Sequence, residues 1–295
     1  MVFRRQSSGS VVCPSCGRLV GVRDEQCLNC GRRRPGMFGF TQAFRNLGDD
    51  LGFARLLIWS CGVLYVLMLV TDPSGVGGGG LFDFLGPSTR SALLFGSTGV
   101  YPVLGEGRWW TVLSAVWLHG SILHIAFNMM WAYQLVPPVA RLYGGGRAVI
   151  IFLGAGVAGF LATTFAGYVP VLPSLPFLRP ASLTLGASGA ILGLLGALVH
   201  YGRRTGSSMV GRQALGSAVA LIVFGLVMVR VDNWAHLGGF AGGYLIARWL
   251  DPLKPEHGNH TIVAVLLLIL SALSILFSIV DGLSLVRALS DAGYL

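Results

Sequence analysis

Seven long apolar stretches dominate this chain, and their length restricts it to folds that place helices across a membrane. The sequence is 54% hydrophobic and only 11% charged, far from the composition of soluble domains. Each stretch is long enough to span a hydrocarbon core of ~30 Å as an α-helix. We therefore predict an all-α polytopic membrane protein, with spans near 54–71, 115–137, 147–169, 185–202, 213–230, 234–250 and 261–281.

The basic residues predict how these spans are oriented. With a cytoplasmic N-terminus, 16 of the 21 Lys and Arg residues lie inside, and the five outside are Arg90, Arg108, Arg179, Arg230 and Arg287. This asymmetry follows the positive-inside rule. The polar, basic segment before the first span does not resemble a cleavable signal peptide, so that span is expected to insert the chain. We expect a multi-pass protein of the cell membrane whose net charge of +9 attracts anionic lipids and needs no nucleic-acid partner.

Four of the five cysteines form two Cys-x2-Cys pairs, each followed by glycine. This spacing is typical of a zinc ribbon, in which four thiolates hold one structural metal ion. Two disulfides are the alternative, which a reducing cytosol disfavours. We predict a cytosolic ribbon over residues 1–35 that serves docking of a protein partner or regulation, with the ligands Cys13, Cys16, Cys27 and Cys30. The lone Cys61 is expected to pack as a small apolar residue.

The segment between the ribbon and the first span carries a helical pattern. Its large apolar residues recur with one-face spacing, at Phe40, Phe44, Leu47 and Leu51. We predict that residues 36–53 form an amphipathic helix on the inner membrane surface. A plain linker is the alternative.

The longest outer loop, residues 72–110, changes character along its length. A glycine run at 77–80 is interpreted as a hinge or spacer, because it lacks the Gly-Lys-Ser/Thr ending of a phosphate-binding loop. The later part is too apolar for a solvated loop. We expect it to fold back into the membrane edge with Trp109 and Trp110 at the interface.

Two polar residues among small neighbours are the main candidates for chemistry. Ser188 and His236 begin the fourth and sixth spans, which both start at the outer surface in the predicted topology. Polar groups at membrane depth are costly, and a serine with a histidine in reach can perform nucleophilic acyl transfer. Flanking glycines permit the close helix approach that such a pair needs, namely Gly186, Gly189, Gly239 and Gly243. The alternative is that the glycines only pack helices and the serine bonds its own backbone.

The second span adds three polar residues: His119, His124 and Asn128. On one continuous helix, His119 and His124 would lie roughly 140° apart, which disfavours a shared metal ion. His124 and Asn128 share a face, and two side-chain donors aimed at one point suit a developing oxyanion. Bridging between helices or lining of a water pocket is the alternative. His119 is interpreted as a tie for the outer loop.

At this point the sequence resembles the rhomboid family of intramembrane serine proteases over roughly residues 90–255. The motifs that carry the resemblance keep the family's order and spacing: Trp110, His119-x4-His124-x3-Asn128, Gly186-x-Ser188-Gly189 and Ala235-His236-x2-Gly239-x3-Gly243. The resemblance implies a six-helix core over 54–255, with residues 256–295 as an added seventh helix and tail.

The resemblance also implies a reaction. Ser188 and His236 would form a dyad that needs no carboxylate or cofactor, and the oxyanion hole would consist of His124, Asn128 and the Ser188 backbone amide. The substrates would be transmembrane segments of other proteins, entering laterally and cut near small residues.

Two departures from the family pattern concern residues around this site. Thr111 follows Trp110 where the family often has arginine, and Leu192 replaces an aromatic residue that would stack on the histidine. A catalytically silent, client-binding relative is one alternative, but loss of the serine or the histidine would mark that class, and both are present. A transporter or channel is another, although it predicts acidic residues deep in the spans, and the span interiors have none.

Overall fold

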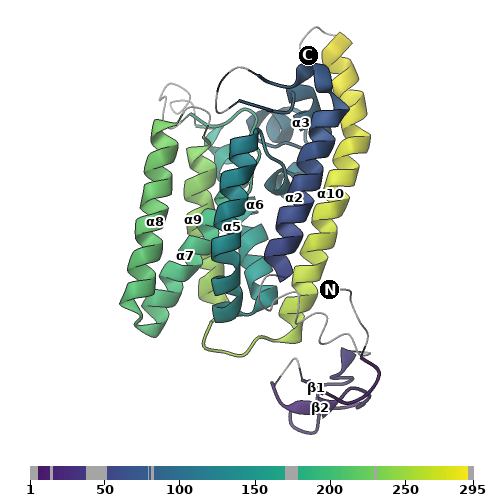
Figure 1. Cartoon of the computed structure of the whole chain (residues 1–295), viewed down its shortest axis with the longest axis vertical. Coiled ribbons are helices and arrows are strands. Elements are labelled where there is room, and N and C mark those ends of the chain that lie inside the picture. Colours follow the sequence, from purple (N-terminus) through teal and green to yellow (C-terminus); the bar gives the residue numbers. More distant parts are fainter. Residues whose placement is uncertain are drawn as a thin grey trace.

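The computed structural model is a helical bundle with a small ribbon at one end (Figure 1). It describes residues 6–13, 16–37, 52–78, 80, 83–169, 179–228 and 231–291. Most of the predicted amphipathic helix at 36–53 lies outside the described residues. The long helices of the described part are α2 (Gly52–Thr71), α5 (Ile122–Tyr143), α6 (Gly145–Ala166), α7 (Ser188–Thr205), α8 (Ser208–Val227), α9 (Asn233–Trp249) and α10 (Gly258–Asp291).

Shorter elements form the ribbon and the first long loop. They are the antiparallel strands β1 (Ser10–Val12) and β2 (Leu19–Gly21), followed by η2 (Pro73–Gly75), α3 (Thr89–Phe95), η3 (Tyr101–Gly105), α4 (Thr111–Ser114) and η4 (Ala115–Trp117). The ribbon touches the bundle where α10 begins, since a Cβ built on Gly258 would lie 2.6 Å from Arg32 Nη1. We call this the ribbon end and the other the far end.

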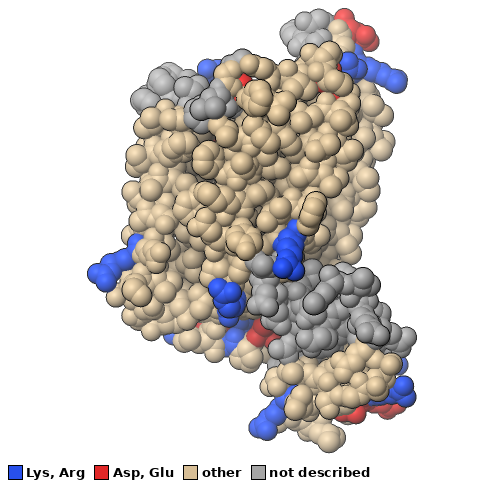
Figure 2. All heavy atoms as spheres, viewed as in Figure 1, with Lys and Arg blue, Asp and Glu red and all other residues tan. Residues whose placement is uncertain are grey.

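The described helices make this a multi-pass membrane protein. Four of them, α2, α6, α8 and α10, are long and apolar enough to cross a bilayer, and the bent pair of α4–η4 with α5 makes a fifth. On the face shown in Figure 2, charged side chains gather toward the two ends and leave a broad uncharged band between them. The predicted spans at 185–202 and 234–250 correspond to α7 and α9, which have only 18 and 17 residues and are not among the long apolar helices.

The second predicted span was wrong in its shape. Instead of one helix from residue 115, α4 and η4 end at Trp117, and α5 begins at Ile122 after a bend of 90°. Leu118 is extended, and the Ser121 hydroxyl caps α5 by accepting the His124 backbone N–H at 3.2 Å. The apolar run at 112–118 hides this break, because apolarity alone does not report the serine cap.

Helices α7 and α9 cross with their backbones in contact because glycines line both faces. A Cβ built on Gly239 would collide with the Gly189 carbonyl, and one built on Gly243 would collide with the backbone of Gly193. A second glycine track on α9, Gly238 and Gly242, faces α6 in the same way. This close packing confirms the predicted approach of the fourth and sixth spans and fixes the serine-bearing helix against the histidine-bearing one.

Candidate active site and metal centre

Ser188 and His236 are hydrogen-bonded across the α7–α9 contact. Ser188 is the first residue of α7, and its Oγ lies 2.9 Å from His236 Nε2. His236 lies in the first turn of α9 and is 8% exposed, whereas Ser188 is half-buried. A hydroxyl that donates to an imidazole nitrogen at this distance has the geometry of a nucleophile with its general base.

In the part of the chain that the structure describes, the second nitrogen of the histidine ring is not bonded to a carboxylate, as it would be in a Ser-His-Asp triad. His236 Nδ1 is buried and has no hydrogen-bond partner among the described residues. The nearest carboxylate in sequence, Asp232, caps α9 instead: its Oδ1 accepts the Ala235 backbone N–H at 3.0 Å. Leu192 is buried on α7, and no aromatic ring stacks on His236 within the described part of the chain.

His124 lies beside the segment that leads to the serine. A Cβ on Gly186, which has φ +131°, would be 2.7 Å from His124 Nε2. The Gly120 backbone N–H donates to His124 Nδ1 at 3.3 Å. A neutral imidazole that accepts a hydrogen bond at Nδ1 carries its proton at Nε2. His124 therefore presents an N–H donor beside Gly186, which precedes Ser188 by two residues.

Asn128 lies one turn further along the same face of α5. Its Nδ2 donates to the His124 carbonyl oxygen at 2.8 Å, and its buried Oδ1 has no hydrogen-bond partner among the described residues. An amide nitrogen carries two protons, so one N–H remains for another acceptor.

The first backbone amides of α7 add further donors. The first intrahelical bond runs from the Ile191 N–H to the Ala187 carbonyl. The N–H groups of Ser188, Gly189 and Ala190 therefore precede the helical bonding pattern, and the positive end of the helix dipole lies at the serine.

The remaining predicted site residues occupy supporting positions. His119 is buried in the bend before α5, and its ring centroid lies 5.2 Å from that of His124. The assumed separation of the two rings on one helix was therefore wrong. Trp110 contacts α10: its Nε1 donates to Ser278 Oγ at 3.0 Å.

The sequence did not predict one ion pair, in which the arginine is buried and the aspartate is partly exposed. Arg108 is 2% exposed and donates to Asp281 Oδ2 at 2.8 Å, and to the carbonyls of Leu93 and Ser278, each at 3.0 Å. Sequence alone gave no signal for it, because the two charges lie 173 positions apart.

Arg108 belongs to a loop that also holds the approach to Ser188. Thr98 and Thr184 exchange both backbone hydrogen bonds at 2.9 and 2.7 Å, and the Gly186 N–H donates to the Ala115 carbonyl at 2.9 Å. Helix α10 is therefore connected to the serine-bearing segment through this loop.

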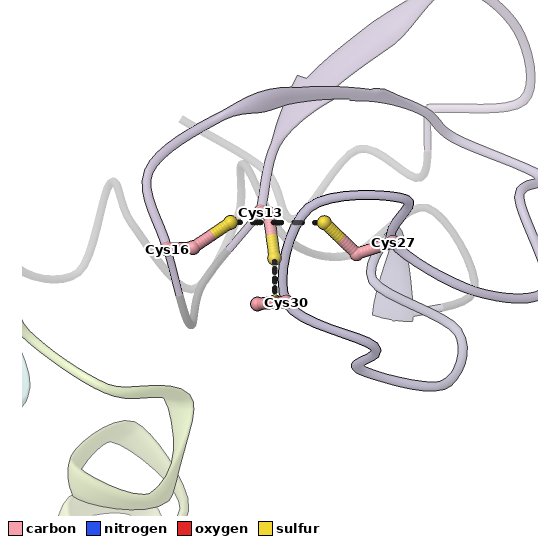
Figure 3. Close-up of side chains that lie close together, drawn as sticks. All are labelled: Cys13, Cys16, Cys27 and Cys30. Carbon is pink, nitrogen blue, oxygen red and sulfur yellow. Dashed lines mark hydrogen bonds between the residues drawn. The ribbon is translucent and has the colours of Figure 1, made fainter.

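The four N-terminal cysteines form a second candidate site, shown in Figure 3. Their sulfur atoms all lie within 4.8 Å of one another, with Cys13–Cys30 at 3.7 Å and Cys16–Cys27 at 3.6 Å. These separations exclude disulfides of ~2.05 Å. They fit the ~3.8 Å between ligands of a tetrahedral site with metal–sulfur bonds of ~2.3 Å.

The two cysteine knuckles repeat each other. Gly17 and Gly31, with φ of +73° and +72°, donate to the carbonyls of Cys13 and Cys27, so each knuckle needs glycine in the left-handed region. The backbone amide of Arg18 lowers the pKa of the Cys16 thiol to about 6, whereas burial and the neighbouring thiols raise the pKa of Cys30 to about 12, so Cys16 is the thiol that most readily forms the metal-binding thiolate. The predicted ligand set thus lies together and could hold one metal ion.

The region that contains Ser188 and His236 is similar to proteins of a known family. The Rhomboid domain family matches residues 106–252. Rhomboid protease GluP of Bacillus subtilis (strain 168) is 33% identical over 198 residues, which cover 65% of this chain and 36% of that protein. RHOMBOID-like protein 4 of Arabidopsis thaliana is 31% identical over 178 residues, covering 59% and 42%.

A third relative is shorter. The Putative rhomboid protease YdcA of Bacillus subtilis (strain 168) is 27% identical over 154 residues, covering 51% of this chain and 71% of that protein. The first two relatives are matched over less than half of their own length.

Proposed function

Because the chain belongs to the rhomboid family, we propose that it is an intramembrane serine endopeptidase in which Ser188 and His236 form the catalytic dyad. The observation that carries this proposal is the 2.9 Å hydrogen bond between Ser188 Oγ and His236 Nε2. The pair lies inside a helical bundle, where a polar contact of this kind is costly without a function.

In the proposed reaction, Ser188 Oγ attacks the scissile carbonyl carbon while His236 Nε2 takes the hydroxyl proton. The tetrahedral intermediate collapses, the carbon–nitrogen bond breaks, and His236 returns the proton to the leaving amine. A water molecule then attacks the acyl-enzyme with His236 again as base, which releases the acid product and restores Ser188. These steps need no cofactor.

The oxyanion would be stabilised by donors around the start of α7. The Ser188 backbone amide precedes the helical bonding pattern, and the orientation of His124 supports an Nε2–H directed toward Gly186. Asn128 would supply its second amide proton. Each such donor typically contributes about 10-fold to 1000-fold to turnover.

The substrates proposed are transmembrane or juxtamembrane segments of other membrane proteins. The dyad would open toward the outer face, with the ribbon in the cytoplasm. The described basic residues of the bundle support this orientation, because most lie at the ribbon end: Arg55, Arg141, Arg147, Arg203, Arg204, Arg212, Arg248 and Lys254.

We propose zinc as the metal of the cysteine cluster, because four thiolates are a preferred ligand set for structural zinc. Bound zinc would hold the two knuckles together. The ribbon would serve docking of a partner or regulation, at a distance from the dyad.

The test is cleavage of a model transmembrane substrate by purified protein in proteoliposomes. Wild type should cut it, and Ser188→Ala should not, while both insert and melt alike. Cleavage by Ser188→Ala at the wild-type rate would overturn the assignment.

A further inference from the structure

The proton on the far side of the catalytic histidine lacks an assigned acceptor. If Ser188 donates to His236 Nε2, the neutral ring carries its own proton at Nδ1. That nitrogen is buried and without a hydrogen-bond partner among the described residues. A buried N–H group without a hydrogen-bond acceptor is costly. A histidine whose proton can lie on either ring nitrogen is also a less effective general base.

Asn233 lies one turn before His236 on the same face of α9. It is the first residue of that helix and is 7% exposed, with a buried Oδ1. An amide oxygen accepts two hydrogen bonds. Asn233 can therefore accept a hydrogen bond from the His236 side in addition to any other contact that it makes.

Gly225 of α8 shows that the two side chains face the same space. A Cβ built on Gly225 would lie 2.7 Å from Asn233 Oδ1 and 3.2 Å from His236 Nδ1, so both atoms lie within 3.2 Å of one point. The same Cβ would be 2.9 Å from Val231 Cγ1, which closes this space with an apolar wall. A side chain at position 225 would fill the space beside both atoms, which glycine leaves open.

Asp232 is the competing acceptor, because its Oδ2 is also buried without a hydrogen-bond partner among the described residues. Its Oδ1 is used to cap α9 through the Ala235 N–H. The three atoms nearest to the Cβ built on Gly225 belong to Asn233, Val231 and His236, so Asn233 lies closer than Asp232 to the space beside His236 Nδ1.

We propose that Asn233 is the positioning residue of His236, and this rests on the proposed function of the dyad. His236 Nδ1 makes no direct hydrogen bond with the described residues, so the Asn233 side-chain oxygen accepts the Nδ1–H proton through one water and thereby fixes the tautomer in which Nε2 receives the serine proton. The site is then an Ser188–His236–Asn233 chain, with Gly225 supplying the space that the chain needs.

The experiment compares four variants of the full chain: Asn233→Leu, Asn233→Asp, Gly225→Ala and Gly216→Ala. Leucine keeps the size of asparagine without an acceptor, and aspartate keeps an acceptor oxygen. Gly216 lies on the same helix α8 with nothing within 4 Å of its built Cβ, so it is the matched control for Gly225. The measurements are kcat, KM and the rate at which a fluorophosphonate labels Ser188.

We expect Asn233→Leu to lower kcat and the labelling rate by about 10-fold to 100-fold with little change in KM, as for loss of one buried hydrogen bond to the base. Asn233→Asp should recover most of this loss. Gly225→Ala should resemble Asn233→Leu, and the double variant should be little worse than either, because members of one unit are non-additive. Gly216→Ala should match wild type.

Equal losses in Asn233→Leu and Asn233→Asp, or wild-type labelling of Asn233→Leu, would overturn the inference. If Asn233→Leu does not fold, wild-type kcat in Gly225→Ala would overturn it instead. Failure of the wild-type protein to label at Ser188 would contradict the proposed function itself, so the two failures are distinguishable.

Discussion

The inner pair of helices, α7 and α9, differs in kind from the outer helices α2, α8 and α10. The outer helices are long and apolar, and only 33%, 17% and 22% of the residues in the most apolar stretch of each are buried inside the bundle. The two inner helices have only 18 and 17 residues, and neither is long and apolar enough by itself to cross a bilayer. Yet this pair carries Ser188, His236 and the glycine contacts.

This difference has a physical cause. A helix that faces lipid must be apolar because nothing else lines its surface, whereas a helix enclosed by others can use glycine and polar residues. High hydropathy is found both in these outer helices and in the more buried α6, whereas the candidate site lies on the two helices that are not long and apolar enough to cross a bilayer alone. The comparison predicts that equal changes have unequal effects on the two classes of helix.

The largest expected effect is on the inner pair's chemistry. His236→Ala should lower turnover at least about 1000-fold, and Ser188→Ala combined with His236→Ala should be little worse than either, because a nucleophile and its base act as one unit. Steady-state cleavage of the model substrate measures this. Losses that multiply would show that the two residues act independently.

The next effect is on stability. Gly243→Val on α9 should destabilise the fold by more than about 3 kcal/mol, because the new side chain would overlap the backbone of Gly193. Gly62→Val on α2 is the matched control, since nothing lies within 4 Å of its built Cβ. Thermal unfolding in detergent compares them, and equal midpoints would break the distinction between inner and outer helices.

Helix α10 sharpens the comparison, because it is an outer helix that makes polar contacts with buried Arg108. Asp281→Asn should destabilise the protein by about 1–3 kcal/mol, since it leaves the charge of buried Arg108 without its carboxylate. Asp291→Asn, at the exposed end of α10, should have no effect. If the two variants unfold alike, the Arg108–Asp281 pair does not anchor the outer loop.

The smallest effect on catalysis is expected from the ribbon. Cys16→Ser should release the bound metal while turnover in detergent stays within about 2-fold of wild type, because the ribbon touches the bundle at the end opposite to the dyad. Metal analysis of the purified protein checks this, with Cys61→Ala as the variant that keeps its metal. Loss of turnover with a folded core would give the ribbon a direct role in catalysis.

Local patterns in the sequence predicted several parts of this molecule. Ser188 and His236 were found because polar residues among small neighbours stand out in apolar stretches, and the four cysteines because their spacing repeats. The starts of α7 and α9 lie within three residues of the predicted starts at 185 and 234.

The parts that were missed depend on contacts between distant residues. Arg108 looked like an ordinary outer arginine, and only the fold brings it to Asp281. The bend before α5 was hidden in an apolar run, and the spacing alone did not decide whether Asp232 or Asn233 orients His236. Such features are set by packing between elements, which periodicity along one element does not report.

The most direct test of the central claim is labelling of the folded protein with a fluorophosphonate, followed by mass-spectrometric mapping of the modified residue. The account predicts one modified residue, Ser188, in wild type, and at least about 1000-fold slower labelling in His236→Ala. No labelling of wild type, or labelling at another serine, would contradict a Ser188–His236 dyad and favour a catalytically silent, client-binding protein.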